Sequence, residues 1–133
     1  MKLKRVVANK NGTITLAKKL ARTLLRHDIV TLTGDLGAGK TTFTASVAKT
    51  LGVKEKVISP TFNILKCYFD GKIPFYHIDA YRLEEHNKEI GLEEYIEGDG
   101  VAFIEWPDYI KELLNIPHLE INIKNLGGNK REI

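Results

Sequence analysis

Residues 29–41 read Ile-Val-Thr-Leu-Thr-Gly-Asp-Leu-Gly-Ala-Gly-Lys-Thr, and this stretch decides the fold class. Its first five residues are β-branched or apolar, which predicts a short buried strand. The eight residues from Gly34 to Thr41 match the pattern G-x-x-x-x-G-K-[ST] at every fixed position. A helix is expected to begin near Lys40 and to end before Gly52, because glycine favours the position that follows a helix. A strand, a glycine-rich turn and a helix in this order form the context in which the pattern binds phosphate.

The glycine-rich turn has the chemistry of a phosphate-binding loop. Glycines let the backbone approach phosphate oxygens closely, and successive N–H groups form an anion-binding nest at the positive end of the helix dipole. Lys40 is placed to reach the β- and γ-phosphates, and the hydroxyl of Thr41 is a ligand for Mg²⁺. The residues that we expect to bind the nucleotide at this turn are Asp35, Leu36, Gly37, Ala38, Gly39, Lys40, Thr41 and Thr42.

Two expected strands end in a carboxylate that could complete such a site. Asp79 ends the apolar run Phe75–Asp79, and Glu105 ends the run Val101–Glu105. Mg²⁺ is held by few protein ligands together with phosphates and waters, and spacing alone ranks neither carboxylate above the other. His77 precedes Asp79 by two residues and therefore faces the same side of its strand; we expect a hydrogen-bonded structural histidine beside the site. The residues expected to carry catalysis are Lys40, Asp79 and Glu105.

Two further positions extend the expected site. Thr61 lies in Ser59-Pro60-Thr61-Phe62, after the helix that follows the glycine turn. In P-loop GTPases and ATPases a threonine in this place senses the γ-phosphate and the metal. Trp106, the single tryptophan, directly follows Glu105 and would either exclude water from the nucleotide, contact a partner or pack in the core. We expect Thr61 and Trp106 to contact the nucleotide.

Helices and strands alternate along the rest of the chain, which is typical of an α/β layer fold. A first helix is expected to start at Thr13 or Thr15 and to extend to about His27, because leucines recur at every fourth residue. Asp-Gly at positions 70–71, between two apolar runs, predicts a β-hairpin. The other expected elements are strands at Lys2–Ala8, Leu119–Lys124 and Arg131–Ile133 and helices over 84–96 and 107–114.

The composition indicates one globular domain over residues 1–133, with 43% hydrophobic and 28% charged residues. A net charge of +3 is too small to indicate a nucleic-acid binder. Cys67 is the only cysteine, which excludes a disulfide within the chain. No apolar run approaches the ~20 residues of a membrane span, and the first residues lack the pattern of a signal peptide. We expect a cytoplasmic α/β protein, a single P-loop NTPase-type domain with a mixed, mostly parallel sheet flanked by helices.

Four motifs in order carry a resemblance to a known family. They are the glycine-rich turn extended through Thr42-Phe43, Ser59-Pro60-Thr61-Phe62, His77-Ile78-Asp79-Ala80-Tyr81-Arg82-Leu83 and Ile104-Glu105-Trp106-Pro107. Together they resemble the bacterial TsaE family, the small ATPases of tRNA threonylcarbamoyladenosine biosynthesis. The resemblance covers nearly the whole chain. Four motifs at suitable spacing identify the family specifically, although each motif alone is only weakly specific for it.

The resemblance implies a compact P-loop domain that binds ATP with Mg²⁺ and hydrolyses ATP slowly on its own. Its partner would be a heterodimeric threonylcarbamoyl transferase of the TsaD–TsaB type, which modifies adenosine 37 of tRNAs that read ANN codons. ATP turnover would reset that complex between rounds, and contact with tRNA would be indirect. The family pattern assigns metal contacts to Thr41 and Glu105 and makes Asp79 a site residue. By resemblance, Thr13 in the first helix and Arg131 in the late turn contact the nucleotide.

Three other functions are compatible with a phosphate-binding loop. A small kinase usually carries an arginine-rich lid, whereas this chain has five scattered arginines. A switch GTPase carries an Asn-Lys-x-Asp motif, and the Asn-Lys pairs at 87–88 and 129–130 lack its final aspartate. A non-catalytic nucleotide-binding module differs from an ATPase only in whether hydrolysis matters. The sequence favours the ATPase of a tRNA-modification complex.

Overall fold

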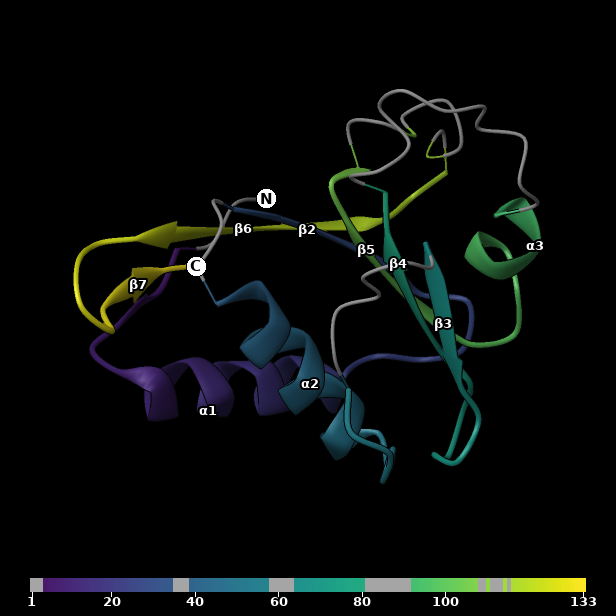
Figure 1. The fold of residues 1–133 in the computed structure, drawn as a ribbon, viewed down its shortest axis with the longest axis horizontal. Coiled ribbons are helices and arrows are strands. Elements are labelled where there is room, and N and C mark those ends of the chain that lie inside the picture. Colours follow the sequence, from purple (N-terminus) through teal and green to yellow (C-terminus); the bar gives the residue numbers. More distant parts are fainter. Residues whose placement is uncertain are drawn as a thin grey trace.

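The structure is a computed structural model that describes residues 4–34, 39–57, 64–80, 92–107, 110, 114 and 116–133. These residues include a seven-stranded sheet in the order β1-β7-β6-β2-β5-β4-β3 (Figure 1). The strands are β1 (Val6–Val7), β2 (Ile29–Gly34), β3 (Leu65–Tyr68), β4 (Phe75–Asp79), β5 (Val101–Glu105), β6 (Leu119–Asn125) and β7 (Arg131–Glu132). The described helices are α1 (Lys10–Ala21), α2 (Lys40–Thr50) and α3 (Glu93–Ile96).

The sheet has a parallel centre and antiparallel margins. β2 lies between β6 and β5 and is parallel to both, and β5 is parallel to β4. β3 joins β4 as the antiparallel hairpin predicted from Asp-Gly at 70–71. On the other side, β7 is antiparallel to β6 and to β1. The expected α/β fold with a mixed sheet is confirmed, and the parallel centre brings the carboxyl ends of four strands to one edge.

Alternation along the strands divides the core between the two faces of the sheet. On β2, Val30 and Leu32 face the side covered by α1 and α2, where they pack with Phe43. Figure 1 shows these two helices together on one side of the sheet. Ile29 faces the other side, in a second cluster that includes Ile96 of α3. Residues two apart on a central strand therefore share one face, and for Val30 and Leu32 it is the face that α1 and α2 cover.

The first helix differs from expectation at both ends. Asn9, not Thr13 or Thr15, is the N-cap, and its side-chain oxygen accepts a hydrogen bond from the N–H of Gly12 at 2.9 Å. The helix ends at Ala21 rather than near His27. His27 has φ 74°, and its N–H donates to the carbonyl of Gly100. The tertiary contact to the loop before β5 overrides the helical leucine pattern, which continues past the true end.

The second helix follows the sequence prediction closely. It begins at Lys40, and Gly52 after its C-terminus has φ 97°. A Cβ added to Gly52 would lie 3.3 Å from the backbone nitrogen of Lys72. Glycine is therefore required here both for the left-handed conformation and for the close approach of the β3–β4 turn.

The carboxylate of Asp70 attaches the β3–β4 turn to the segment that follows α2. Oδ2 of Asp70 accepts hydrogen bonds from the backbone N–H groups of Lys54 at 2.9 Å and Glu55 at 3.0 Å. These backbone donors, Lys54 first, lower the pKa of Asp70 below its ordinary value. The contact joins the hairpin to the segment that follows the glycine-rich turn and its helix.

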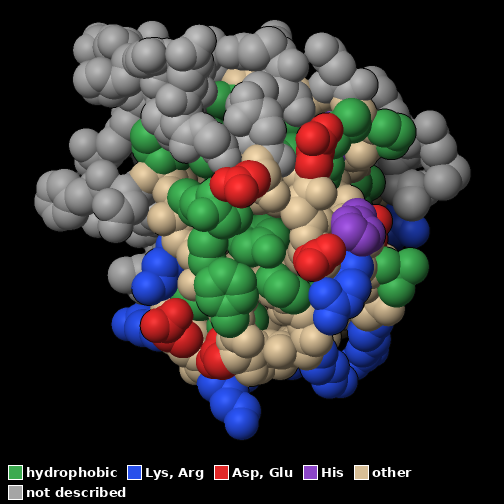
Figure 2. Space-filling model, turned by 90° about the vertical axis from the view of Figure 1, so that its right-hand side faces the viewer, with side chains coloured by type: hydrophobic (Ala, Val, Ile, Leu, Met, Phe, Trp, Pro, Cys, Tyr) green, Lys and Arg blue, Asp and Glu red, His purple; other side chains and the backbone are tan. Residues whose placement is uncertain are grey.

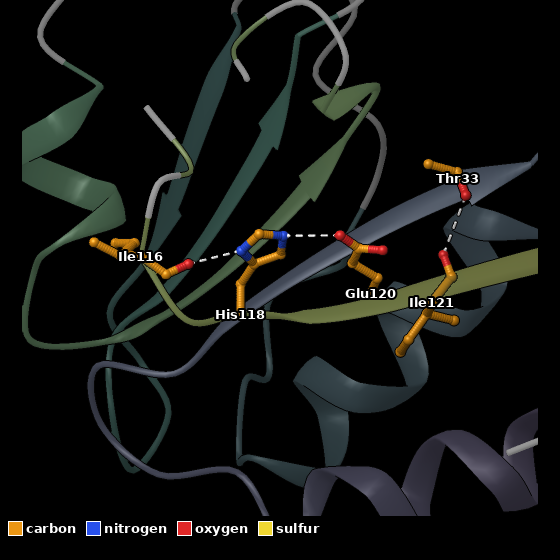
Figure 3. Close-up of polar contacts among 5 residues, drawn as sticks. All are labelled: Thr33, Ile116, His118, Glu120 and Ile121. Atoms are coloured by element: carbon orange, nitrogen blue, oxygen red, sulfur yellow. Dashed lines mark hydrogen bonds and ion pairs between the residues drawn. The ribbon is translucent and has the colours of Figure 1, made fainter. Parts of the chain in front are cut away.

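Polar contacts lie at the start of β6 and between β6 and β2 (Figure 3). His118 lies between the carbonyl of Ile116, 2.8 Å from Nδ1, and the carboxylate of Glu120, 3.2 Å from Nε2. The hydroxyl of Thr33, at the end of β2, donates to the carbonyl of Ile121 at 3.4 Å. The contact between Thr33 and Ile121 supports the register in which β6 continues alongside β2 to Gly34, where the glycine-rich turn begins.

Apolar side chains gather on the face formed around β3 and α3 (Figure 2). Phe69 is 69% exposed, and its ring packs edge-on against Tyr76, which in turn packs edge-on against Tyr95. This aromatic row covers the sheet on the side away from α1 and α2.

The remaining expectations are met in part. The strand expected at Lys2–Ala8 is found as β1, the one at Leu119–Lys124 as β6, and the one at Arg131–Ile133 as β7. Of the helix expected over 84–96, the structure describes only α3 and the residue before it. Much of the helix expected over 107–114 lies outside the described residues. Each helix in the described part of the chain is too short or too polar to cross a membrane.

Candidate nucleotide-binding site

The carboxyl ends of three parallel strands meet beside the start of α2. β2 ends at Gly34, β5 at Glu105 and β4 at Asp79, and these strands are consecutive in the sheet. Asp79 and Glu105 are direct register partners, so the two predicted carboxylates lie side by side on one face. Ligands of open α/β sheets bind at this edge. The fold thus brings together two of the three residues expected to carry catalysis.

Lys40, the third, lies at the first position of α2. Gly39 before it has φ 102°, a left-handed conformation that suits glycine, and it supplies no side chain to cap the helix. The first N–H groups of an uncapped helix are donors for an anion. Lys40 is 7% exposed, and its Nζ lies 4.1 Å from the centre of the Trp106 ring. The start of α2 therefore places backbone donors and one cation at the edge where β5 ends.

Trp106 connects Lys40 to Glu105 through an unusual backbone conformation. Its φ is 58°, which is uncommon for a bulky side chain. This turn directs the indole ring toward Lys40, in a cation–π contact, while the preceding residue continues β5. The contact explains the position of the single tryptophan beside the loop. Sequence analysis placed Trp106 at the site but did not reveal its contact with Lys40, because a left-handed tryptophan has no sequence signature.

Glu105 is hydrogen-bonded to His77 on the face of the sheet that α1 and α2 cover. His77 Nε2 lies 2.7 Å from Glu105 Oε2, and the two residues are 0% and 3% exposed. The expectation of a hydrogen-bonded histidine beside Asp79 is confirmed, and the partner is Glu105. His77 Nδ1 is buried and has no hydrogen-bond partner within the described part of the chain. The sequence could not identify this pair, because it depends on the parallel register of β4 and β5.

Arg131 lies near the last glycine of the phosphate-binding pattern. A Cβ added to Gly39 would lie 4.0 Å from Arg131 Nε. The Nη1 group of Arg131 donates to Asn125 Oδ1 at 3.0 Å and to the carbonyl of Gly128 at 2.7 Å. The β6–β7 turn therefore holds this guanidinium beside the N-terminus of α2, in agreement with its proposed nucleotide contact.

The other expected site residues are placed unequally. Thr13 is buried in α1 at 4% exposure, Thr41 is exposed at the start of α2, and Thr42 is half-buried. Asp35, Leu36, Gly37, Ala38 and Thr61 lie outside the described residues.

The oxygen ligands at this edge suit Mg²⁺. Asp79 and Glu105 supply carboxylates and Thr41 a hydroxyl, and Mg²⁺ prefers oxygen ligands, with waters and phosphates filling the other positions. Among the described residues no group of three or more His, Cys, Asp or Glu side chains forms a metal cage. Mg²⁺ bound with a nucleotide needs no such cage. The site fits a metal that arrives with its phosphates.

Comparison with known proteins decides the family. A family model described as "Threonylcarbamoyl adenosine biosynthesis protein TsaE" matches residues 7–133. The chain belongs to the TsaE family. A Bacillus subtilis protein named "tRNA threonylcarbamoyladenosine biosynthesis protein TsaE" is 47% identical over 131 residues, which are 98% of this chain and 83% of the relative. A Rickettsia felis protein of the same name is 44% identical over 129 residues, 95% of this chain and 75% of that protein.

A solved structure agrees with the TsaE assignment. The crystal structure of Bacillus subtilis YdiB matches with a TM-score of 0.84 at 42% identity, over 98% of this chain and 81% of that one. The family resemblance seen in the four motifs is confirmed, as is the α/β fold. Membership of the TsaE family implies a P-loop NTPase-type fold and nucleotide binding. The individual site residues remain predictions.

Proposed function

We propose that this TsaE-family chain is the ATP-binding and hydrolysing component of the complex that installs the threonylcarbamoyl group on adenosine 37 of tRNAs that read ANN codons. Its relatives are named for tRNA threonylcarbamoyladenosine biosynthesis. The observation that carries the proposal is that Lys40, at the start of α2, lies over the ring of Trp106, which follows β5 directly, at the paired carboxylate ends of β4 and β5. A phosphate-binding loop next to two acidic strand ends suits a nucleoside triphosphate with its metal.

The residues of this chain would act by positioning and by charge. Backbone N–H groups at the start of α2 and the Lys40 ammonium would bind the β- and γ-phosphates. Thr41 and Glu105 would hold Mg²⁺, whose charge would offset that of the phosphates during hydrolysis. Asp79, beside Glu105, would hold a metal-bound water or orient the attacking one. Thr13, Thr61, Trp106 and Arg131 would complete the nucleotide pocket.

Full activity would require the partner, a heterodimeric transferase of the TsaD–TsaB type. The sequence has no evident arginine finger of its own, and Arg131 is held by Asn125 and the Gly128 carbonyl. A partner residue, or ordering of the segment around Thr61 by the partner, would supply what the isolated chain lacks. The chain would act in the cytoplasm as one P-loop domain, and contact with tRNA would be made through the partner.

ATP binding and phosphate release, measured for the chain alone and with the heterodimer, test this proposal. We expect Mg²⁺-dependent ATP binding by the chain alone, slow hydrolysis, and faster hydrolysis in the complex. Equal rates with and without the heterodimer would contradict the requirement for a partner. Absence of ATP binding in both samples would contradict the proposed function itself.

A further inference from the structure

A buried histidine–glutamate pair lies behind the proposed metal site. His77 is fully buried, and Glu105 is 3% exposed. Their hydrogen bond, 2.7 Å between His77 Nε2 and Glu105 Oε2, is the only hydrogen bond to this carboxylate among the described residues. A buried carboxylate is costly unless it is hydrogen-bonded or paired. Packing alone therefore does not explain why the fold buries this pair.

The sheet places three functional side chains in one patch. His77 and Asp79 are two residues apart on β4 and point to the same face. Glu105 pairs in register with Asp79, and Phe103, one layer deeper, pairs with His77. The histidine thus reaches Glu105 diagonally from the core side, while Asp79 lies level with Glu105 at the open edge. His77 therefore approaches the carboxylate from within the sheet, away from the edge at which Asp79 lies.

We infer that His77 is a positioning residue whose Nε2–H holds Oε2 of Glu105 and so leaves Oε1 as the oxygen that binds Mg²⁺ with the nucleotide. This inference rests on the proposed function and adds to it a residue with no nucleotide contact of its own. An ionised carboxylate oxygen only accepts hydrogen bonds, so the contact requires the proton on Nε2. Metal-binding carboxylates are commonly fixed by such hydrogen bonds, and losing one typically reduces metal affinity about 10–100-fold.

The decisive comparison uses His77→Leu and His77→Gln. The leucine fills the space but cannot donate, whereas the glutamine amide can place an N–H near the position of Nε2. Each variant is titrated with Mg²⁺ in the presence of ATP, with the fluorescence of Trp106 as the signal for binding. We expect the Mg²⁺ concentration at half-saturation to rise about 10–100-fold in His77→Leu. In His77→Gln it should stay within about threefold of the wild type, because the hydrogen bond is retained.

Ile78→Ala serves as the matched control. Ile78 is also fully buried on β4, but it faces the other side of the sheet and belongs to the cluster around α3. This variant should be destabilised without any change in Mg²⁺ dependence. The inference is overturned if His77→Leu titrates like the wild type, or if His77→Gln and Ile78→Ala show the same loss as His77→Leu. Failure of the proposed function would look different, since the wild type itself would then show no Mg²⁺-dependent nucleotide binding.

A second measurement needs neither metal nor nucleotide and remains informative if His77→Leu fails to fold. In the ¹⁵N NMR spectrum of the imidazole rings of the free wild-type protein, His77 should carry its proton on Nε2. Glu105→Ala should shift that resonance, whereas Asp79→Ala should leave it nearly unchanged. A proton on Nδ1 alone, or no response to Glu105→Ala, would contradict the inference.

Discussion

Lys40 combines low exposure with a position at the very start of a helix. It is 7% exposed and lies over the Trp106 ring, and it follows Gly39, whose left-handed backbone precedes the helix without a side-chain cap. A cation on an aromatic face keeps much of its ability to bind a stronger anion, since cation–π contacts are worth about 0.5–2 kcal/mol. Trp106 therefore holds Lys40 beside the site, and we expect phosphate to compete with the indole ring for the ammonium group.

Replacement of Lys40 tests this view. Lys40→Ala should lower ATP turnover in the complex about 100-fold or more, because a preorganised charge on the transferring phosphates is lost. The far-ultraviolet circular dichroism spectrum should be unchanged, since Lys40 packs on the ring of Trp106 and does not belong to either apolar core cluster. Lys49→Ala, at the exposed end of the same helix, should turn over ATP normally. Loss of the folded spectrum in Lys40→Ala would show that the lysine is structural.

Glu105 and Asp79 are neighbours with different surroundings, which separates their roles. Glu105 is buried and hydrogen-bonded to His77, whereas Asp79 is half-buried at the edge. Glu105→Gln should raise the Mg²⁺ concentration needed for ATP binding about tenfold or more, because even an indirect support of a metal ligand contributes that much. Nucleotide binding measured in EDTA should change far less. An unchanged Mg²⁺ titration, together with a changed one in Asp79→Asn, would move the ligand role to Asp79.

At the scale of elements, the hairpin β3–β4 is fastened to the end of α2 through Asp70. Its pKa is lowered chiefly by the N–H of Lys54, so the carboxylate stays ionised in the folded protein at a pH where the unfolded chain is already protonated. The contact therefore stabilises the fold above the ordinary value of 3.8, and this stabilisation is lost as the pH falls through the lowered pKa.

Asp70→Asn should reveal this pH dependence. Near pH 7 the variant should melt at a lower temperature than the wild type, and the difference should shrink as the pH falls below the ordinary value of 3.8 and through the lowered pKa of Asp70. Thermal unfolding followed by circular dichroism across this range measures the effect. Glu97→Gln, a change at an exposed residue after α3, should show no such convergence. A difference in melting temperature that stays constant down to acid pH would exclude the carboxylate as its source.

Elements with a strong local signal could be predicted from the sequence. The strand before the glycine turn, the helix after it and the Asp-Gly hairpin all lie where local chemistry places them. The end of α1 could not be predicted, because His27 is taken out of the helix by a contact with Gly100, which is remote in sequence. Its start was missed because Asn9 outcompetes the two threonines as the cap.

The candidate site, like the fold, could be predicted from the sequence only in part. Lys40, Asp79 and Glu105 were predictable, because a motif and two strand ends mark them. The pairs that organise them, Lys40 with Trp106 and His77 with Glu105, were not. The His77–Glu105 pair depends on the register of β4 and β5, and the Lys40–Trp106 pair depends on a residue with positive φ. Neither feature has a recognisable sequence pattern. Residue types were predictable, and the contacts between them were not.

At the scale of the whole molecule, the parallel centre of the sheet determines where chemistry can occur. Four parallel strands end at one edge, and α2 begins beside it. α1 and α2 cover the face on which His77 and Glu105 meet, so the apolar core lies beneath the two carboxylates. We expect a small domain built in this way to bind a nucleotide by itself. In the proposed function, a partner that holds the other reactants would couple that nucleotide to transfer chemistry.

The most direct test of whether ATP turnover by this protein resets the transferase is the amount of modified tRNA formed per transferase complex. The TsaD–TsaB type heterodimer is supplied with tRNA, the threonylcarbamoyl donor and ATP, with the wild-type chain, with Lys40→Ala or with neither. We predict many rounds of modification with the wild-type chain, and about one round per complex with Lys40→Ala or without the chain. Equal product in all three samples would contradict the claim that ATP turnover by this protein resets the transferase.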